Sequence, residues 1–238
     1  MLLSINIDHI ATLRNARGEG FPNPVVAAQI CEKAGADGIV VHLREDRRHI
    51  KDIDVYTLRD VLKTKLDLEM GASEEIIKIA LKVKPDLVTL VPEKRNELTT
   101  EGGLDLISFK EKYKNVISEF HNNNIPVSLF IDPVENQIEI AKEIESDFIE
   151  LHTGEYANSI GEQQKKHFQK ILNSAIFAKQ IGLTVNAGHG LNYFNIKSIA
   201  EIKEINELSI GFAIIAQSVW VGLENAVKEM LKLVKTNE

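Results

Sequence analysis

Histidines stand at the ends of several predicted strands. Four of the seven histidines, His9, His42, His152 and His189, lie at or just after such an end. Parallel strands bring their carboxyl ends to one face, which is where α/β proteins form active sites. An imidazole exchanges protons near neutral pH. A single histidine at such a position is more often structural, but four together favour acid–base catalysis.

Arginine is concentrated in the same regions. The chain contains seven arginines against 21 lysines, and six of the seven lie in segments that we expect to be loops after strands: Arg14, Arg17, Arg44, Arg47, Arg48 and Arg95. A planar guanidinium binds phosphate oxygens through paired hydrogen bonds. The run 44–49 taken alone is equally compatible with a solvated charged loop. In an acidic protein, arginines gathered on one face predict an anionic ligand, and a phosphorylated small molecule fits best.

Carboxylates lie inside predicted strands. Asp67 and Glu69 share one side of a strand, as do Glu150 and His152 in another, because side chains alternate along a strand. Asn6 and Asp8 have the same relationship near the N-terminus, with Ser4 on their side. A buried carboxylate must be paired, protonated or used chemically. A carboxylate with a raised pKa beside a histidine is suited to general acid–base catalysis, and a satisfied polar network is the alternative.

Glycines follow the last two predicted strands. The segment 186–190 reads Asn-Ala-Gly-His-Gly, and Gly211 precedes Phe212. Glycine allows backbone N–H groups to approach a phosphate closely, particularly at a helix N-terminus. Barrels often hold a phosphate between these two loops.

Other chemistries lack their usual residue spacing. The sequence has no His-x-His, His-Glu-x-x-His or Cys-x-x-Cys, so we expect no dedicated metal site. It has no Gly-x-Gly-x-x-Gly after the first strand, which argues against a nicotinamide cofactor. No lysine lies inside a predicted strand, and this disfavours a Schiff-base lysine. Cys31 is expected to pack in the core.

These residues require a framework of alternating strands and helices. Amphipathic helices are predicted between the strands, for example at 24–34, 73–83, 104–122, 134–144, 162–180 and 223–234. Eight strands are predicted at 3–7, 38–42, 66–70, 86–91, 126–131, 147–152, 183–187 and 207–211. Eight such units predict an α/β fold, a (β/α)8 TIM barrel that forms one domain over 1–238. An open doubly wound sheet is the alternative.

Composition limits the functional class. The 238 residues carry a formal net charge of −7, which argues against a general nucleic-acid binder. A single cysteine excludes an internal disulfide and fits a reducing compartment. No apolar run is long enough to span a membrane, and the N-terminus does not resemble a signal peptide. We therefore expect a cytoplasmic protein.

The sequence resembles the pyridoxine 5′-phosphate synthase family of the deoxyxylulose-dependent route to vitamin B6. The likeness is colinear from end to end, and the block 41–50 is its most specific part. The matching segments are 6–17, 41–50, 68–70, 91–95, 99–105, 128–132, 151–154 and 186–191. The resemblance implies a transferase that condenses 1-deoxy-D-xylulose 5-phosphate with 3-amino-2-oxopropyl phosphate. The implied products are pyridoxine 5′-phosphate, phosphate and water, formed without a metal or organic cofactor.

The resemblance also implies roles for individual residues. His42 and Glu69 are expected to be general bases, His189 a proton donor, and Glu150 a residue that stabilises a transition state. The residues expected to hold the deoxyxylulose phosphate are Asp8, His9, Arg44, His49 and Thr99. The residues expected to hold the amino-ketone phosphate are Asn6, Arg17, Gly190, Gly211 and Phe212. Family members also have extra helices and form homo-octamers.

The chain departs from the family at one position. The family pattern has Gly-His after the eighth strand, where this chain has Gly211-Phe212. A backbone N–H contact to phosphate survives this change, whereas an imidazole contact does not. Two other functions remain open from the residues alone. One is a metal-dependent pentose-phosphate epimerase or aldolase, and the other is a non-catalytic barrel that binds a sugar phosphate.

Overall fold

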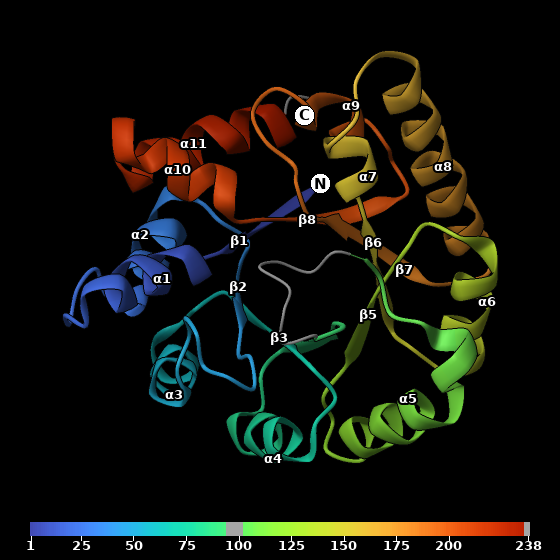
Figure 1. The fold of residues 1–238 in the computed structure, drawn as a ribbon, viewed down its shortest axis with the longest axis horizontal. Coiled ribbons are helices and arrows are strands. Elements are labelled where there is room, and N and C mark those ends of the chain that lie inside the picture. Colours follow the sequence, from blue (N-terminus) through green and yellow to red (C-terminus); the bar gives the residue numbers. More distant parts are fainter. Residues whose placement is uncertain (94–101, 236–238) are drawn as a thin grey trace.

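The predicted strands form a closed barrel in the computed structural model, which describes residues 1–93 and 102–235. The order around the barrel follows the sequence, and β1 pairs with both β2 and β8, so the ring is complete (Figure 1). All eight pairings are parallel. The strands are β1 (Leu2–Asn6), β2 (Gly38–His42), β3 (Lys65–Met70), β4 (Leu87–Leu90), β5 (Val127–Ile131), β6 (Phe148–His152), β7 (Thr184–Gly188) and β8 (Ile205–Ile210). The (β/α)8 prediction is confirmed, and the open-sheet alternative is wrong.

Helices surround the barrel on all sides (Figure 1). In the described part of the chain, eight of the helices form the set of one helix after each strand. The helices α1, α7 and α10 are additional, as the family resemblance implies. The helices are α1 (Asp8–Arg17), α2 (Pro24–Ala34), α3 (Asp52–Val61), α4 (Glu74–Val83), α5 (Leu106–His121), α6 (Glu135–Glu143), α7 (Gly154–Ala157), α8 (Gly161–Gln180), α9 (Ile196–Ala200), α10 (Phe212–Val221) and α11 (Leu223–Val234).

Local sequence explains where α2 begins and ends. Pro24 occupies its first turn, and the side chain of Asn23 accepts a hydrogen bond from the Val25 N–H. Gly35 ends the helix at φ 107°, a left-handed conformation that favours glycine. Cys31 faces the core from this helix and is fully buried, as predicted, and burial raises the pKa of its thiol to about 12.

Alternate strand residues fill two different layers. Leu66 and Leu68 of β3 belong to the apolar core between the strands and the helices. The intervening side chains face the barrel interior, where Lys65 reaches Glu207 of the non-adjacent strand β8 at 2.6 Å. The prediction that no lysine lies inside a strand is therefore wrong. Its amine is held by the Glu207 carboxylate and is not presented as a nucleophile.

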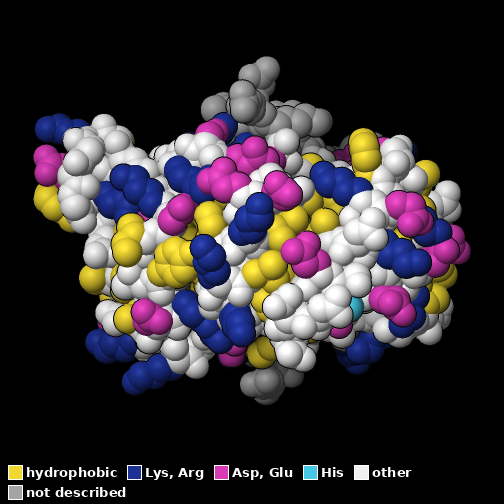
Figure 2. Space-filling model, turned by 90° about the horizontal axis from the view of Figure 1, so that it is seen from below, with side chains coloured by type: hydrophobic (Ala, Val, Ile, Leu, Met, Phe, Trp, Pro, Cys, Tyr) yellow, Lys and Arg dark blue, Asp and Glu magenta, His cyan; other side chains and the backbone are white. Residues whose placement is uncertain are grey.

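The outer surface on the side of α3, α4 and α5 mixes basic, acidic and apolar side chains (Figure 2). Such mixing of both charge signs is typical of a solvated face. Among the described residues, the structure has no helix that is long and apolar enough to cross a membrane.

Candidate active site

The strand ends and the loops after them enclose a cavity of about 540 Å³, within the usual range for a small-molecule site. Twelve residues predicted from sequence to act in catalysis or binding line it: Asn6, Asp8, His9, His42, Arg44, His49, Glu69, Glu150, His189, Gly190, Gly211 and Phe212. Arg48, one of the arginines expected to bind an anion, also lines it. The remaining lining residues had no role predicted from the sequence: Thr12, Val91, Phe130, Leu191, Ser209 and Ile210.

Two predicted residues are not placed in this cavity. Arg17 is exposed on the last turn of α1 and is not among the lining residues. Thr99 lies outside the described residues, as does Arg95.

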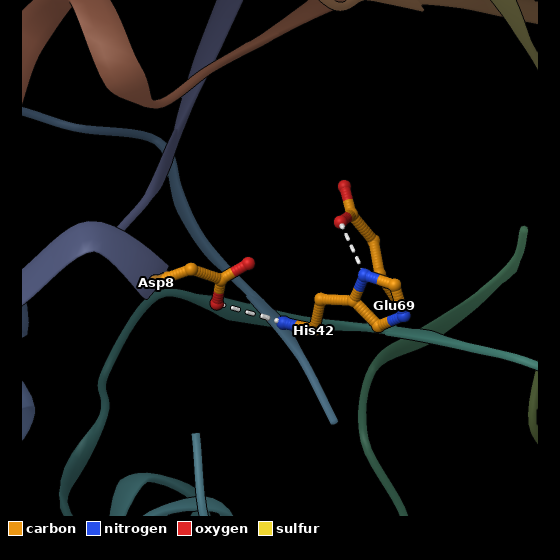
Figure 3. A group of neighbouring side chains, drawn as sticks. All are labelled: Asp8, His42 and Glu69. Atoms are coloured by element: carbon orange, nitrogen blue, oxygen red, sulfur yellow. Dashed lines mark hydrogen bonds and ion pairs between the residues drawn. The ribbon is translucent and has the colours of Figure 1, made fainter. Parts of the chain in front are cut away.

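A hydrogen-bond network joins the first three strands at the mouth of the barrel. Asp8 begins α1, and its Oδ1 accepts the backbone N–H of His42 at 2.9 Å. The Asn6 amide donates to Asp8 Oδ2 at 3.0 Å and to Glu69 Oε2 at 3.4 Å. His42 Nδ1 lies 4.0 Å from Glu69 Oε2, so the imidazole and the carboxyl group face each other (Figure 3). The network fixes the imidazole of His42 and the carboxyl group of Glu69 side by side.

Buried carboxyl groups continue from this point into the barrel. Burial, together with the negative charges of Glu150, Asp8 and Asp67, raises the pKa of Glu69 well above its ordinary value. Burial is also the largest cause for Glu150, whose pKa rises to about 8, and for Asp67, whose pKa rises to about 7. Asp67 accepts a hydrogen bond from the Thr89 hydroxyl at 2.8 Å. Asp67 and Glu150 can therefore hold or release protons near neutral pH.

The loop after β7 holds His189 in an uncommon backbone conformation. His189 has φ 81° and Gly190 has φ 77°, both in the left-handed region. The Thr153 hydroxyl stabilises this turn by donating to the carbonyl oxygens of Gly188 and His189 at 2.8 and 2.6 Å. Burial and the nearby His152 lower the pKa of His189 to about 4.

The loop after the neighbouring strand β8 brings Phe212 against His9. Their rings meet edge to face with centroids 5.2 Å apart, and Phe212 remains two-thirds exposed at the start of α10. Gly211 precedes this helix next to Asn6, and a Cβ at position 211 would lie 2.9 Å from the Asn6 Cβ. Glycine is therefore required where the backbone of β8 passes Asn6.

The arginines after β1 and β2 differ in their environments. Arg14 lies on α1, not in a loop as predicted, and its guanidinium forms a bidentate ion pair with Asp54 at 2.6 and 2.9 Å. Arg47 binds Asp52 and Glu75, again on the protein itself. Arg44 is buried and lines the cavity. Arg14 and Arg47 thus form ion pairs within the protein, and of these three arginines only Arg44 lines the cavity.

Sequence analysis assigned no role to two carboxylates that lie behind the histidines. Glu93 Oε1 is 2.9 Å from His42 Nε2, and Asp132 Oδ1 is 3.0 Å from His152 Nδ1. Glu93 follows β4 and Asp132 follows β5 directly. The signal that selected the histidines, a polar residue just past a strand end, would have selected both acids as well.

One group in the described part of the chain has donor atoms close enough for a metal ion. Asp8, His42 and Glu69 each offer one atom, and these lie within 4.8 Å of one another. The Asp8 carboxylate already accepts hydrogen bonds from Asn6 and His42, one on each oxygen.

Comparisons with known proteins agree with these observations. The family model described as "Pyridoxal phosphate biosynthesis protein PdxJ" matches residues 3–236. A pyridoxine 5′-phosphate synthase of Prochlorococcus marinus (strain MIT 9312) is 55% identical over 235 residues, which cover 99% of each chain. The enzyme of the same name from Pelodictyon phaeoclathratiforme is 56% identical over 236 residues, which cover 99% of this chain and 100% of that one.

Solved structures show the same fold at low identity. A crystal structure of 3-hexulose-6-phosphate synthase has a TM-score of 0.66 at 15% identity, covering 98% of this chain and 100% of that chain. KGPDC from Streptococcus mutans has a TM-score of 0.65 at 14% identity, covering 99% and 97%. These two establish the barrel alone. The family match over nearly the whole length and the identity above one half establish more: this chain belongs to the PdxJ family of pyridoxal phosphate biosynthesis proteins.

Proposed function

We propose that this chain condenses 1-deoxy-D-xylulose 5-phosphate with 3-amino-2-oxopropyl phosphate to give pyridoxine 5′-phosphate, phosphate and water. The observation that carries the proposal is the pairing of His42 with Glu69 on the wall of the cavity, with Nδ1 and Oε2 4.0 Å apart. Because the chain belongs to the PdxJ family, we assign this acid–base pair to closure of a pyridine ring.

His42 and Glu69 act as general bases in this proposal. Ring closure with loss of water requires protons to leave carbon or nitrogen and others to reach departing oxygens. Burial and the neighbouring carboxyl groups raise the pKa of Glu69, so it takes up a proton more readily than an exposed glutamate does. Holding two substrates beside fixed acids and bases also removes the entropic cost of bringing them together.

His189 and Glu150 complete the acid–base set. In the free protein His189 is neutral at neutral pH because its pKa is about 4. A bound phosphate dianion favours its protonated form. It can then donate a proton to a leaving oxygen. Glu150 lies deeper in the cavity wall, and its carboxyl group is positioned to stabilise positive charge on a nitrogen-containing intermediate once it is ionised.

Two groups of cavity residues would receive the two phosphates. Arg44, His49, His9 and Asp8 line the cavity, and Thr99 is proposed to join them in binding the deoxyxylulose phosphate. The other phosphate would meet backbone N–H groups at the loops that follow β7 and β8. Asn6, Gly190, Gly211 and Phe212 line the cavity there, next to the first group because the Phe212 ring contacts His9, and Arg17 is proposed to reach this phosphate from α1.

Replacing Glu69 by Gln tests the catalytic proposal. The variant keeps the shape of the side chain but cannot accept a proton, so turnover is expected to fall by at least about 100-fold. Affinity for each phosphorylated substrate should stay within a few-fold, measured by calorimetry. Glu74→Gln makes the same change on the exposed start of α4 and serves as the control. Near-normal turnover in Glu69→Gln would remove Glu69 from the mechanism.

A further inference from the structure

The carboxylate of Glu93 makes three contacts behind His42. Its Oε1 lies 2.9 Å from His42 Nε2 and accepts the backbone N–H of Gly71 at 2.9 Å. Its Oε2 accepts the backbone N–H of Glu45 at 3.2 Å. Both side chains are enclosed, with 6% of His42 and 10% of Glu93 exposed. Glu93 therefore connects the segments that follow β2, β3 and β4 at the ring of His42.

These contacts determine the protonation state of the acid. Burial alone would raise the pKa of Glu93, but the hydrogen bond from His42 and those from the N–H groups of Glu45 and Gly71 stabilise its charged form. The pKa of Glu93 is therefore below its ordinary value. An ionised carboxylate can only accept hydrogen bonds. The short contact to His42 consequently requires a hydrogen on Nε2.

The position of that hydrogen leaves the other ring nitrogen free to act as a base. In a neutral imidazole one nitrogen carries the hydrogen and the other carries the lone pair. Nδ1 is the atom that faces Glu69, at 4.0 Å from Oε2 (Figure 3). His49, the other charged or titratable ring beside His42, lies further away, with ring centroids 6.0 Å apart. The backbone N–H of His42 donates to Asp8 Oδ1 at 2.9 Å, which fixes the main chain that carries the ring.

We propose that Glu93 is a positioning residue that holds His42 in the tautomer protonated on Nε2, so that Nδ1 is the basic atom presented to Glu69 and to substrate. The carboxylate also stabilises the imidazolium that forms when Nδ1 takes a proton, because the hydrogen bond to an ionised partner strengthens. The catalytic consequence rests on the proposed function, whereas the tautomer of His42 does not.

Gly71 provides a second way to disturb the same carboxylate. A Cβ at this position would lie 3.0 Å from the Glu93 Cδ and 3.1 Å from its Oε1. Gly71→Ala therefore forces the carboxylate beside His42 to shift by a few tenths of an ångström without removing its charge. If the tautomer of His42 changes in both Gly71→Ala and Glu93→Gln, the cause is the Glu93 carboxylate, because each substitution reaches the His42 ring through that group.

The first test is the tautomer itself, measured by NMR on the full chain labelled with ¹⁵N-histidine, without ligand. The signals of His42 are identified by their loss in His42→Gln. We expect a protonated Nε2 and an unprotonated Nδ1 in the wild type, and a mixture of both tautomers in Glu93→Gln and Gly71→Ala. A wild-type ring protonated on Nδ1, or an unchanged tautomer in both variants, would overturn the proposal. Unfolding curves verify that the variants are folded.

The second test separates positioning from binding in steady-state kinetics. We expect kcat of Glu93→Gln to fall by roughly 100-fold, the low end of what positioned acid–base groups contribute, while both KM values stay within about threefold. Glu74→Gln is the matched control on exposed surface. Unchanged kcat in Glu93→Gln would refute the catalytic consequence. If the wild type forms no product, the proposed function fails, and the NMR result still decides the tautomer.

Discussion

The imidazole rings of His152 and His189 meet edge to face across two neighbouring strand ends, with centroids 5.0 Å apart and planes inclined by 62°. Asp132 holds His152 in place through Nδ1, whereas His189 stands on the left-handed turn after β7. The contact places His189 in a buried setting beside a second ring that can become positive. Its basicity is correspondingly reduced.

This contact predicts the titration of His189 in the free protein. Burial and His152 disfavour the charged form, so the midpoint of its imidazole signal is expected near pH 4, below the ordinary value of 6.5. Because the folded pKa is below the unfolded one, the unfolded chain binds this proton first, and stability is lost as pH falls from about 6.5 towards 4. His152→Asn should raise the midpoint. An NMR titration with a midpoint near 6.5 in the wild type would contradict this account.

The two arginines of α1 are predicted to behave differently. Arg14 and Asp54 form a buried bidentate pair, and Arg14 also donates to the His49 carbonyl oxygen. Arg14→Ala leaves a buried carboxylate unpaired, so the free energy of unfolding should fall by about 3–5 kcal/mol. Arg17 is exposed, and Arg17→Ala should change Tm by at most about 2 °C.

Kinetics then tests the proposed ligand contact of Arg17. A lost charged hydrogen bond is worth roughly tenfold or more, so KM for 3-amino-2-oxopropyl phosphate should rise about tenfold in Arg17→Ala. An unchanged KM would remove Arg17 from the phosphate site, in agreement with its position outside the cavity lining.

At Gly211 and Phe212 we expect the backbone to contribute more than the phenyl side chain to binding of the amino-ketone phosphate. Gly211→Ala would bring a Cβ within 2.9 Å of the Asn6 Cβ and 3.1 Å of its carbonyl oxygen, so the loop must shift. We expect KM for the amino-ketone phosphate to rise at least about tenfold, as for the loss of a charged hydrogen bond. Phe212→Ala removes only an exposed ring and should change KM by less than about threefold. The opposite ranking would assign phosphate binding to the aromatic side chain.

The sequence predicted strands better than it predicted some helices. The limits of β2, α2 and α11 agree with the expected ranges, because apolar periodicity and terminal Gly and Pro residues act locally. The helix α1 was missed. Its buried residues include Asp8 and Arg14, which are stabilised by His42 and Asp54 far along the chain. A helix that buries Asp8 and Arg14 beside Ile10 and Ala11 shows only a weak apolar periodicity in its sequence.

In the site, too, features that depend on local sequence could be predicted, and those that depend on distant contacts could not. Histidines and glycines could be predicted because a strand end determines which face a residue reaches. The hydrogen-bond and ion-pair partners of these side chains could not be predicted, because they depend on which loops approach each other in space. Arg47 binds Asp52 and Glu75, and Glu93 binds His42, across gaps in the chain that no spacing rule covers.

Product formation without metal is the most direct test of the central claim. The purified chain, treated with a chelator, is mixed with 1-deoxy-D-xylulose 5-phosphate and 3-amino-2-oxopropyl phosphate. Pyridoxine 5′-phosphate is followed by mass and released phosphate by colour. We predict both products in equal amounts at a rate that the chelator does not change. Binding of both substrates without product, or activity that disappears with the chelator and returns with a divalent cation, would contradict the account.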